Sequence, residues 1–95
     1  MTADRTPCCV PYCRRSTKHS YSEWICSVHW PAVPKRLKRR LSLFKRRYRQ
    51  RYGNTAWHLY PAGSDNRIGA VRVDRLIRKV WAACKKAAIE SAAGI

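Results

Sequence analysis

Four residues near the beginning of the sequence have the side-chain types and the spacing of a small zinc site. Cys8 and Cys13 form one close pair and Cys26 and His29 form a second, in the pattern C-x4-C-x12-C-x2-H. Thiolate and imidazole ligands suit the tetrahedral preference of Zn2+, and two close pairs joined by a short loop can surround one ion. Because four protein ligands fill the coordination sphere, we expect a structural zinc with no position for a catalytic water.

The sequence leaves alternatives to this ligand set open. Cys9 in place of Cys8 would give C-x3-C, although we favour Cys8, and His19 is a weaker substitute because it has no partner at a short spacing. Plain buried thiols are a further alternative, but four of the five cysteines lie before residue 27. We expect no signal peptide and therefore reduced thiols, which makes a secreted, disulfide-linked toxin a minor alternative. Cys84 falls on the apolar face of a later helix, where a cysteine usually serves as a small core residue.

The head of the chain, residues 1–33, must position these ligands although it contains few aliphatic side chains. The aromatic segment 21–26 (YSEWIC) is predicted as a strand of a small hairpin. Pro31 and Pro34 stiffen the exit from the metal site, and Pro34 suits the first turn of a following helix. We expect a treble-clef-like knuckle in which the metal compensates for a small core.

Residues 34–52 are predicted as a basic helix with a narrow apolar stripe. At 100° per residue the stripe covers about 80° of arc. Leu43 lies off the stripe and is expected to be exposed or at an interface, and Gly53 supplies a left-handed stop after the helix. The stripe residues recur at threes and fours: Leu37, Leu41, Phe44, Tyr48 and Tyr52.

A linker at 53–66 and a second helix at 67–93 are predicted for the remainder. The linker is rich in turn formers and has room for one helical turn around Trp57, and Ser64, Asp65 or Asn66 can cap the second helix. We expect the two helices to pack as an antiparallel pair through their apolar stripes, with Trp81 as the largest side chain between them. The apolar face of the second helix consists of Ala70, Val73, Ile77, Trp81, Cys84 and Ala88.

The predicted fold is therefore mainly α, with a small zinc-stapled knuckle and β-hairpin followed by an antiparallel two-helix unit. The knuckle occupies residues 1–33 and the basic helical pair residues 34–95. At 95 residues the two parts are expected to form one compact unit.

The surface charge points to a polyanionic partner. The formal net charge is +16, and no acid interrupts the ten basic residues from Lys35 to Arg51. Such a chain seeks nucleic acid, an acidic protein face or an anionic membrane, and nucleic acid is the commonest of these. We expect DNA in preference to RNA, and no membrane partner. The predicted phosphate contacts are Arg36, Arg39, Arg40, Arg46, Arg47 and Arg49.

Catalysis has little support in the sequence. The five acids are scattered, and there is no paired carboxylate, no Ser/His/Asp set and no glycine-rich phosphate loop. HNH-type nucleases use a related zinc scaffold, but their additional catalytic histidine and acid have no convincing counterpart here. No run of 18 apolar residues is present, so no transmembrane helix is predicted. We therefore expect a protein without enzymatic activity.

Two stretches resemble small uncharacterised zinc-finger-like proteins of bacteriophages and prophages. The first is WICSVHWPAVPKRLKRR, which has the C-x2-HW element followed by VPK and a basic Leu-Arg helix, after the C-x4-C pair. The second is RKVWAACKKAAIESAAGI near the end. The resemblance covers both ends of the chain but not residues 53–70. It implies a phage protein of the bacterial host cytoplasm with Cys8, Cys13, Cys26 and His29 as zinc ligands. The doublet Cys8-Cys9 departs from the usual single first cysteine.

Together these observations predict a non-enzymatic, zinc-containing nucleic-acid-binding protein of a phage. The alternative is a phage effector that binds an acidic surface of a host protein, such as a polymerase or a defence enzyme. A salt-tolerant hydrophobic contact through Leu43 or Trp57 would distinguish the effector from the nucleic-acid-binding protein.

Overall fold

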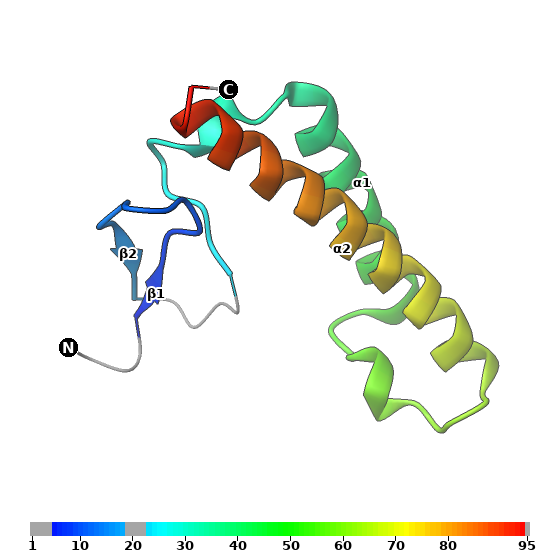
Figure 1. Cartoon of the computed structure of the whole chain (residues 1–95). Coiled ribbons are helices and arrows are strands. Elements are labelled where there is room, and N and C mark those ends of the chain that lie inside the picture. The colour runs from blue at the N-terminus through cyan, green and yellow to red at the C-terminus, as the bar shows by residue number, and fades with distance from the viewer. Residues whose placement is uncertain (1–4, 19–22, 95) are drawn as a thin grey trace. The chain divides into compact units, whose positions relative to one another are not determined.

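The computed structural model describes residues 5–18 and 23–94 and confirms a mainly helical fold with a small two-stranded hairpin (Figure 1). The chain divides into two compact units. Unit 1 comprises Met1–Pro34 and Ala83–Ile95, and unit 2 comprises Lys35–Ala82. The elements in chain order are β1 (Thr6–Pro7), β2 (Ser16–Thr17), a 3-10 turn at Trp30–Ala32, α1 (Lys35–Tyr52), a 3-10 turn at Trp57–Leu59 and α2 (Asp65–Ala92).

The hairpin lies around the first pair of cysteines and not where the sequence predicted it. β1 and β2 are antiparallel, with Thr6 opposite Thr17 and Pro7 opposite Ser16. The prediction of a strand at 21–26 is wrong for its described part, Glu23 to Cys26, which has only an isolated bridge from Trp24 to Cys8. The first half of that segment lies outside the described residues. The chain can reverse between β1 and β2 because a tight turn at Pro11 and Tyr12 separates the two strands.

Unit 1 has a small core drawn from both of its segments. Val10, Ile25 and Val33 from the first segment are buried, at 4%, 6% and 2% exposure. Cys84 and Ala88 from the end of α2 are buried as well, at 0% and 1%. Apart from the buried Cys8 and Cys26, these five small or medium side chains make a modest core, and this supports the view that a bound metal would add to the stability of the unit.

Within unit 2, α1 has the apolar stripe that its sequence predicts. Leu41 and Tyr52 are buried, while Leu43 is 40% exposed. The helix ends at Tyr52, and Gly53 follows in the left-handed conformation with φ 61° while donating its N–H to the carbonyl of Arg49. The left-handed stop predicted from the sequence is therefore present.

The connection between the helices is short and ordered by side chains. One helical turn occurs at Trp57–Leu59, as expected. The backbone N–H of Arg67 donates to Ser64 Oγ at 3.3 Å, so Ser64 caps α2, which begins at Asp65. The Arg67 guanidinium lies 5.2 Å from the centre of the Trp57 ring and donates to the carbonyl of Tyr60.

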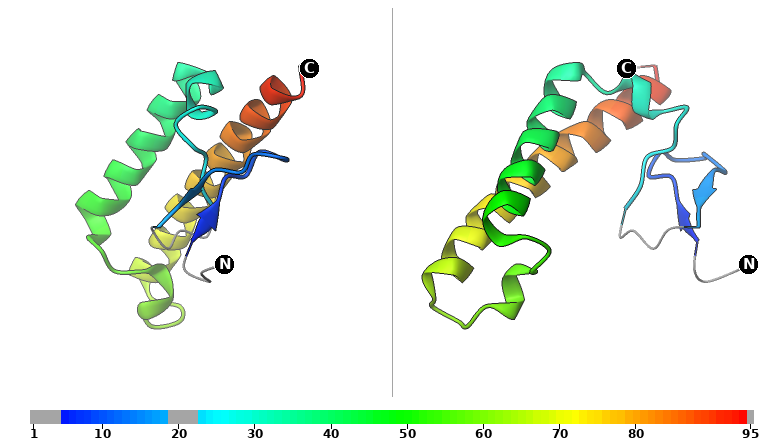
Figure 2. Two further views of the ribbon diagram at one scale, coloured as in Figure 1. Left: turned by 90° about the vertical axis from the view of Figure 1, so that its left-hand side faces the viewer. Right: turned by 180° about the vertical axis from the view of Figure 1, so that it is seen from behind.

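The two helices of unit 2 approach closely at one point. Figures 1 and 2 show α1 beside the Asp65–Ala82 part of α2, running in opposite directions. Gly69 of α2 faces the hydroxyl group of Tyr52, which leaves no room there for a β-carbon. The Tyr52 ring packs between Tyr48 and Tyr60, with centroid distances of 5.1 and 6.0 Å. Burial, helped by Tyr60 and Asp74, raises the pKa of Tyr48, whose hydroxyl donates to the carbonyl of Thr55 at 2.6 Å.

Several sequence predictions about α2 agree with its burial pattern. Ala70, Cys84 and Ala88 are buried and Val73, Ile77 and Trp81 are half-buried. Val80 is also buried, at 7%, although the predicted stripe did not contain it. The division of the chain into a knuckle at 1–33 and a helical pair at 34–95 stays a prediction. Among the described residues, no helix has the length and apolar character needed to cross a membrane.

Candidate metal centre

The first ligand pair is positioned by the hairpin and its turn. Cys8 directly follows β1, and its N–H donates to the carbonyl of Arg15 at 3.0 Å. The Cys13 N–H donates to the carbonyl of Val10 at 3.2 Å, which closes the turn between the two cysteines. Tyr12, at the tip of this turn, is fully exposed and has φ 67°, a left-handed conformation that is unfavourable for a residue with a side chain.

The second ligand pair is positioned by a turn that leads into the 3-10 turn at Trp30–Ala32. Cys26 is completely buried, and its carbonyl accepts hydrogen bonds from the N–H groups of His29 and Trp30, at 3.2 and 2.9 Å. His29 is half-buried, directly before the 3-10 turn. The backbone therefore brings Cys26 Sγ and the His29 ring to the same side of the turn, where Cys26 Sγ and His29 Nδ1 lie 3.2 Å apart.

The structure brings the four predicted ligands together. One ligand atom from each of Cys8, Cys13, Cys26 and His29 lies within 4.8 Å of all the others. Cys13 Sγ lies 3.8 Å from Cys26 Sγ, and Cys8 Sγ lies 3.7 Å from His29 Nδ1. Tetrahedral bonds of about 2.3 Å to sulfur and about 2.0 Å to nitrogen place S···S at about 3.8 Å and S···N at about 3.5 Å. The four groups are thus spaced to bind one metal ion.

Hydrogen bonds prepare one thiol for deprotonation. Burial alone would raise the pKa of Cys26, but the backbone N–H groups of His29 and Val28, together with the His29 ring and the Cys8 thiol, lower it to about 6. The largest single influence on the pKa of Cys13 is a hydrogen bond from the backbone N–H of Arg15, which lowers it. Burial and the neighbouring thiols of Cys26 and Cys8 together outweigh this effect, so the pKa of Cys13 is raised. One thiolate at neutral pH is the first anionic ligand that a cation needs.

The structure distinguishes Cys8 from Cys9 as a candidate ligand. Cys9 does not belong to the cluster, since its Sγ lies 3.8 Å from Glu23 Oε2 and its N–H donates to the carbonyl of Trp24 at 2.8 Å. Burial, opposed by a hydrogen bond from the Trp24 backbone to the Cys9 sulfur and assisted by Glu23, raises the pKa of the Cys9 thiol. Cys84 is buried on α2 and is not part of the cluster, as the sequence predicted. His19, the weaker substitute, lies outside the described residues.

An ion pair that the sequence did not reveal joins the two segments of unit 1. Lys85 Nζ donates to Glu23 Oε2 at 2.7 Å, across 62 residues of sequence. Glu23 raises the pKa of Lys85 through this hydrogen bond and its charge. No sequence signal could have found the pair, because nothing in the pattern places the end of α2 beside residue 23.

The six predicted phosphate contacts all lie on α1 and are all exposed. Among the described residues none of these six arginines forms an ion pair, and α1 contains no acid. At 100° per residue they do not share one face, because Arg39 and Arg46 lie opposite the apolar stripe while Arg36, Arg40 and Arg47 lie to one side. Arg51, which was not among the predicted contacts, is exposed on the same side as these three.

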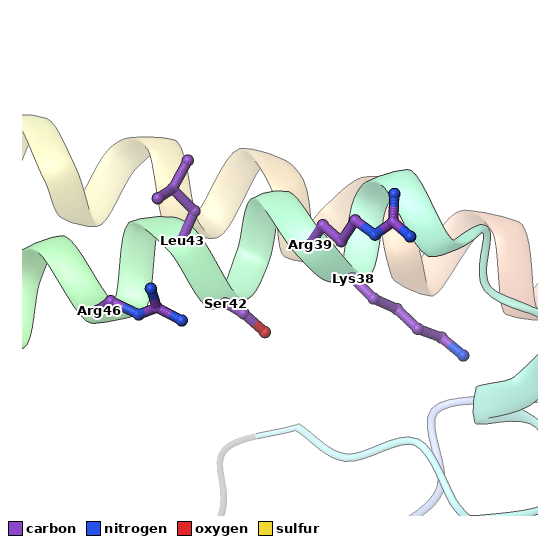
Figure 3. Close-up of a pocket in the computed structure, with 5 residues that line it drawn as sticks. All are labelled: Lys38, Arg39, Ser42, Leu43 and Arg46. Atoms are coloured by element: carbon purple, nitrogen blue, oxygen red, sulfur yellow. The ribbon is translucent and has the colours of Figure 1, made fainter.

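A hollow of about 370 Å3 lies along the exposed surface of α1 (Figure 3). Ser42 is a short side chain one turn from Lys38 and one turn from Arg46, so a gap remains between two long cationic side chains. In Figure 3 Lys38 and Ser42 project to one side of the helix and Leu43 to the other. The five lining residues are Lys38, Arg39, Ser42, Leu43 and Arg46.

Comparison with known proteins identifies no relative of this chain. No protein-family model, no curated protein and no solved structure matches the chain. The arguments for function therefore depend on the metal-binding cluster and on the basic helix.

Proposed function

We propose that the cluster of Cys8, Cys13, Cys26 and His29 binds Zn2+ and that the ion is structural. Three thiolates and one imidazole match the ligand preference of zinc, and the spacing of the ligand atoms matches its tetrahedral bond lengths. Four protein ligands leave no open position, so the ion would hold the hairpin to the turn that carries Cys26. This proposal is supported by the small core of unit 1, which a metal would supplement.

We propose further that the protein binds nucleic acid without enzymatic activity, through α1. The observation that carries this proposal is the basic surface of the helix, in which ten basic residues occur with no acid. Like charges at this density repel one another in the free protein, and phosphates relieve the repulsion while releasing condensed counterions. Among the described residues Arg36 and Arg40 are exposed and form no ion pair, and a guanidinium can bind two phosphate oxygens at once.

A salt series on the zinc-loaded protein tests the nucleic-acid proposal. Six phosphate contacts predict a slope of about −5 in a plot of log binding constant against log salt for duplex DNA, or about a thousandfold loss between 50 and 200 mM salt. Affinity is measured with fluorescent duplex DNA and with single-stranded RNA. A slope near zero, or binding that is already absent at physiological salt, would refute the proposal.

A pair of charge-reversed variants provides the matched comparison. Arg36, Arg40 and Arg47 of α1 are changed to Glu, and in the control protein three exposed basic residues of α2, Arg72, Arg75 and Lys79, are changed to Glu. Both variants lower the formal net charge by six, from +16 to +10. The α1 variant should lose about three units of slope and most of its affinity, whereas the α2 control should lose much less. Equal losses would mean that net charge alone drives binding.

The biological setting is proposed from the sequence resemblance. A phage or prophage origin and a site of action in the bacterial cytoplasm are consistent with a small, strongly basic, reduced-cysteine protein. A co-purification of the tagged protein from infected or lysogenic cells, with nuclease treatment as a control, tests whether the protein binds nucleic acid in this setting. Recovery of nucleic acid that disappears after nuclease treatment is the expected result.

A second candidate function is supported by exposed apolar side chains. Leu43 on α1 and Leu59 in the connection are 40% and 68% exposed. Such residues can anchor a protein partner with an acidic surface, for example a host polymerase or defence enzyme. A host protein that remains bound at high salt and is released by Leu59→Ala would favour this function over nucleic-acid binding.

A further inference from the structure

The basic residues of α1 surround the helix and do not form one flat face. Measured from Leu41 at 100° per residue, they extend from Lys45 at about 40° to Arg51 at about 280°, an arc of about 240°. A flat partner, such as an acidic protein face or a membrane surface, contacts less than half of the circumference of a helix. A partner that neutralises the whole arc must enclose α1 on more than one side.

The arc consists of three rows along the helix. The central row lies opposite the apolar stripe, at about 140° to 200°, and the two flanking rows lie to either side of it. The flanking rows are wholly basic apart from Ser42, while the central row alternates between charged and uncharged side chains. The first flanking row contains Lys35, Lys38, Ser42, Lys45 and Arg49; the second contains Arg36, Arg40, Arg47 and Arg51; the central row contains Arg39, Leu43, Arg46 and Gln50.

The central row has the side-chain chemistry for reading base edges. Leu43 is apolar, yet it lies off the apolar stripe of α1 and is 40% exposed. It is one turn from Arg39 and one turn from Arg46, beside the hollow shown in Figure 3. An arginine can donate two hydrogen bonds to guanine, Gln50 can pair with adenine, and an apolar side chain can contact the 5-methyl group of thymine. The flanking rows contain only cationic side chains apart from Ser42, and cationic side chains suit phosphates.

We propose that α1 enters the major groove of B-form duplex DNA, with the central row against the base edges and one flanking row toward each phosphate strand. This inference rests on the proposed nucleic-acid binding and names its ligand. A helix is about 10–12 Å wide with its side chains and the major groove is about 12 Å wide, so the groove can enclose the helix. The major groove of A-form RNA is too narrow and deep for side chains to read.

The proposal assigns Leu43 a specific contact with a thymine methyl group. Leu43 is the one strongly apolar member of the central row, and thymine is the base that presents an apolar group in the major groove. From Arg39 to Gln50 the central row extends about 16 Å along the helix axis, roughly the rise of five base pairs. The predicted recognition site is therefore short and contains at least one thymine near its centre.

The experiment uses the full chain loaded with zinc and a library of random duplex DNA at physiological salt. The enriched sequence is synthesised with thymine and, at each position in turn, with deoxyuridine, which lacks the methyl group. We expect one position at which the substitution weakens binding about fourfold, the effect of one methyl group taken out of water. Leu43→Ala should bind both duplexes alike and keep the salt slope of the original protein.

Leu76→Ala is the matched control, because Leu76 is also an exposed leucine of a unit 2 helix, at 44%. It should keep both the thymine preference and the salt slope. Strong salt-dependent binding without an enriched sequence, or tighter binding to duplex RNA, would overturn this inference and leave the proposed function intact. Loss of the thymine preference in Leu76→Ala as well would overturn the role of Leu43. Absence of binding to every nucleic acid would refute both proposals.

Discussion

The close approach of Gly69 to Tyr52 leads to a quantitative prediction for the substitution Gly69→Ala. In an isolated helix this change stabilises the helix by about 0.5–1 kcal/mol, because alanine loses less conformational freedom than glycine on folding. In this protein the new β-carbon would overlap the Tyr52 hydroxyl. Tyr52 is only 7% exposed and is flanked by the rings of Tyr48 and Tyr60, so it has little room to move.

Two opposing effects therefore decide the outcome. Overpacking of a buried site costs about 1–3 kcal/mol, which exceeds the gain in helix propensity. We expect Gly69→Ala to lower the free energy of unfolding by about 0.5–2 kcal/mol, equivalent to a fall in Tm of several degrees for a chain of this size. Urea unfolding of the zinc-loaded protein, followed by circular dichroism, measures this change.

In the Tyr52→Phe background, the expected effect of Gly69→Ala on the free energy of unfolding changes from a decrease to an increase. Tyr52→Phe removes the overlapping oxygen and leaves the ring carbon Cζ at 3.4 Å from the added β-carbon, an ordinary contact distance. In the Tyr52→Phe background, Gly69→Ala should therefore stabilise the protein by about 0.5–1 kcal/mol. The coupling energy of the double-mutant cycle should be about 1–3 kcal/mol. A coupling near zero would show that the two helices do not approach at this point.

Three further predictions concern the metal centre. Cys8→Ser should abolish stoichiometric zinc binding and Cys9→Ser should retain one zinc per chain, as measured by atomic absorption after dialysis. Because the pKa of Cys26 is lowered from 9.0 to about 6 in the folded state, its contribution to the stability of the metal-free protein is full above pH 9 and is lost as the pH falls through 6. Zinc, which competes with these protons, should be released to a chromogenic chelator as the pH falls below that value, and a release unchanged between pH 8 and 4 would contradict this. Tyr12→Gly should stabilise the protein by about 1 kcal/mol in thermal unfolding, since glycine adopts φ 67° without strain, and a destabilisation would show that the turn is not left-handed at this residue.

The helices were predictable from the sequence because their signals are local. The stripe from Leu37 to Tyr52 repeats over four turns, and Gly53 marks its end without help from distant residues. The residue Val80 was missed for a related reason, since it lies beside the ideal stripe and is buried by its position within unit 2.

The metal cluster was predictable in its types and spacing but not in the choice between two neighbouring cysteines. The two cysteines are adjacent and chemically alike, and only the folded backbone shows that Cys8 joins the cluster while Cys9 Sγ lies near Glu23 Oε2. The hairpin was misplaced because aromatic residues around Trp24 have strand propensity, whereas the actual strands are two residues long and carry almost no propensity signal.

Unit 1 is assembled from two segments that the ribosome produces at different times. All four candidate metal ligands have been synthesised by residue 29, but Cys84, Lys85 and Ala88 follow more than fifty residues later. A nascent chain therefore contains all four candidate ligands, and the whole basic helix α1, before the second segment of unit 1 has been synthesised. A chain arrested before residue 83 would contain every ligand and yet lack the buried side chains from the end of α2. If the cluster binds the proposed ion, the order of synthesis would allow loading with metal to precede completion of unit 1.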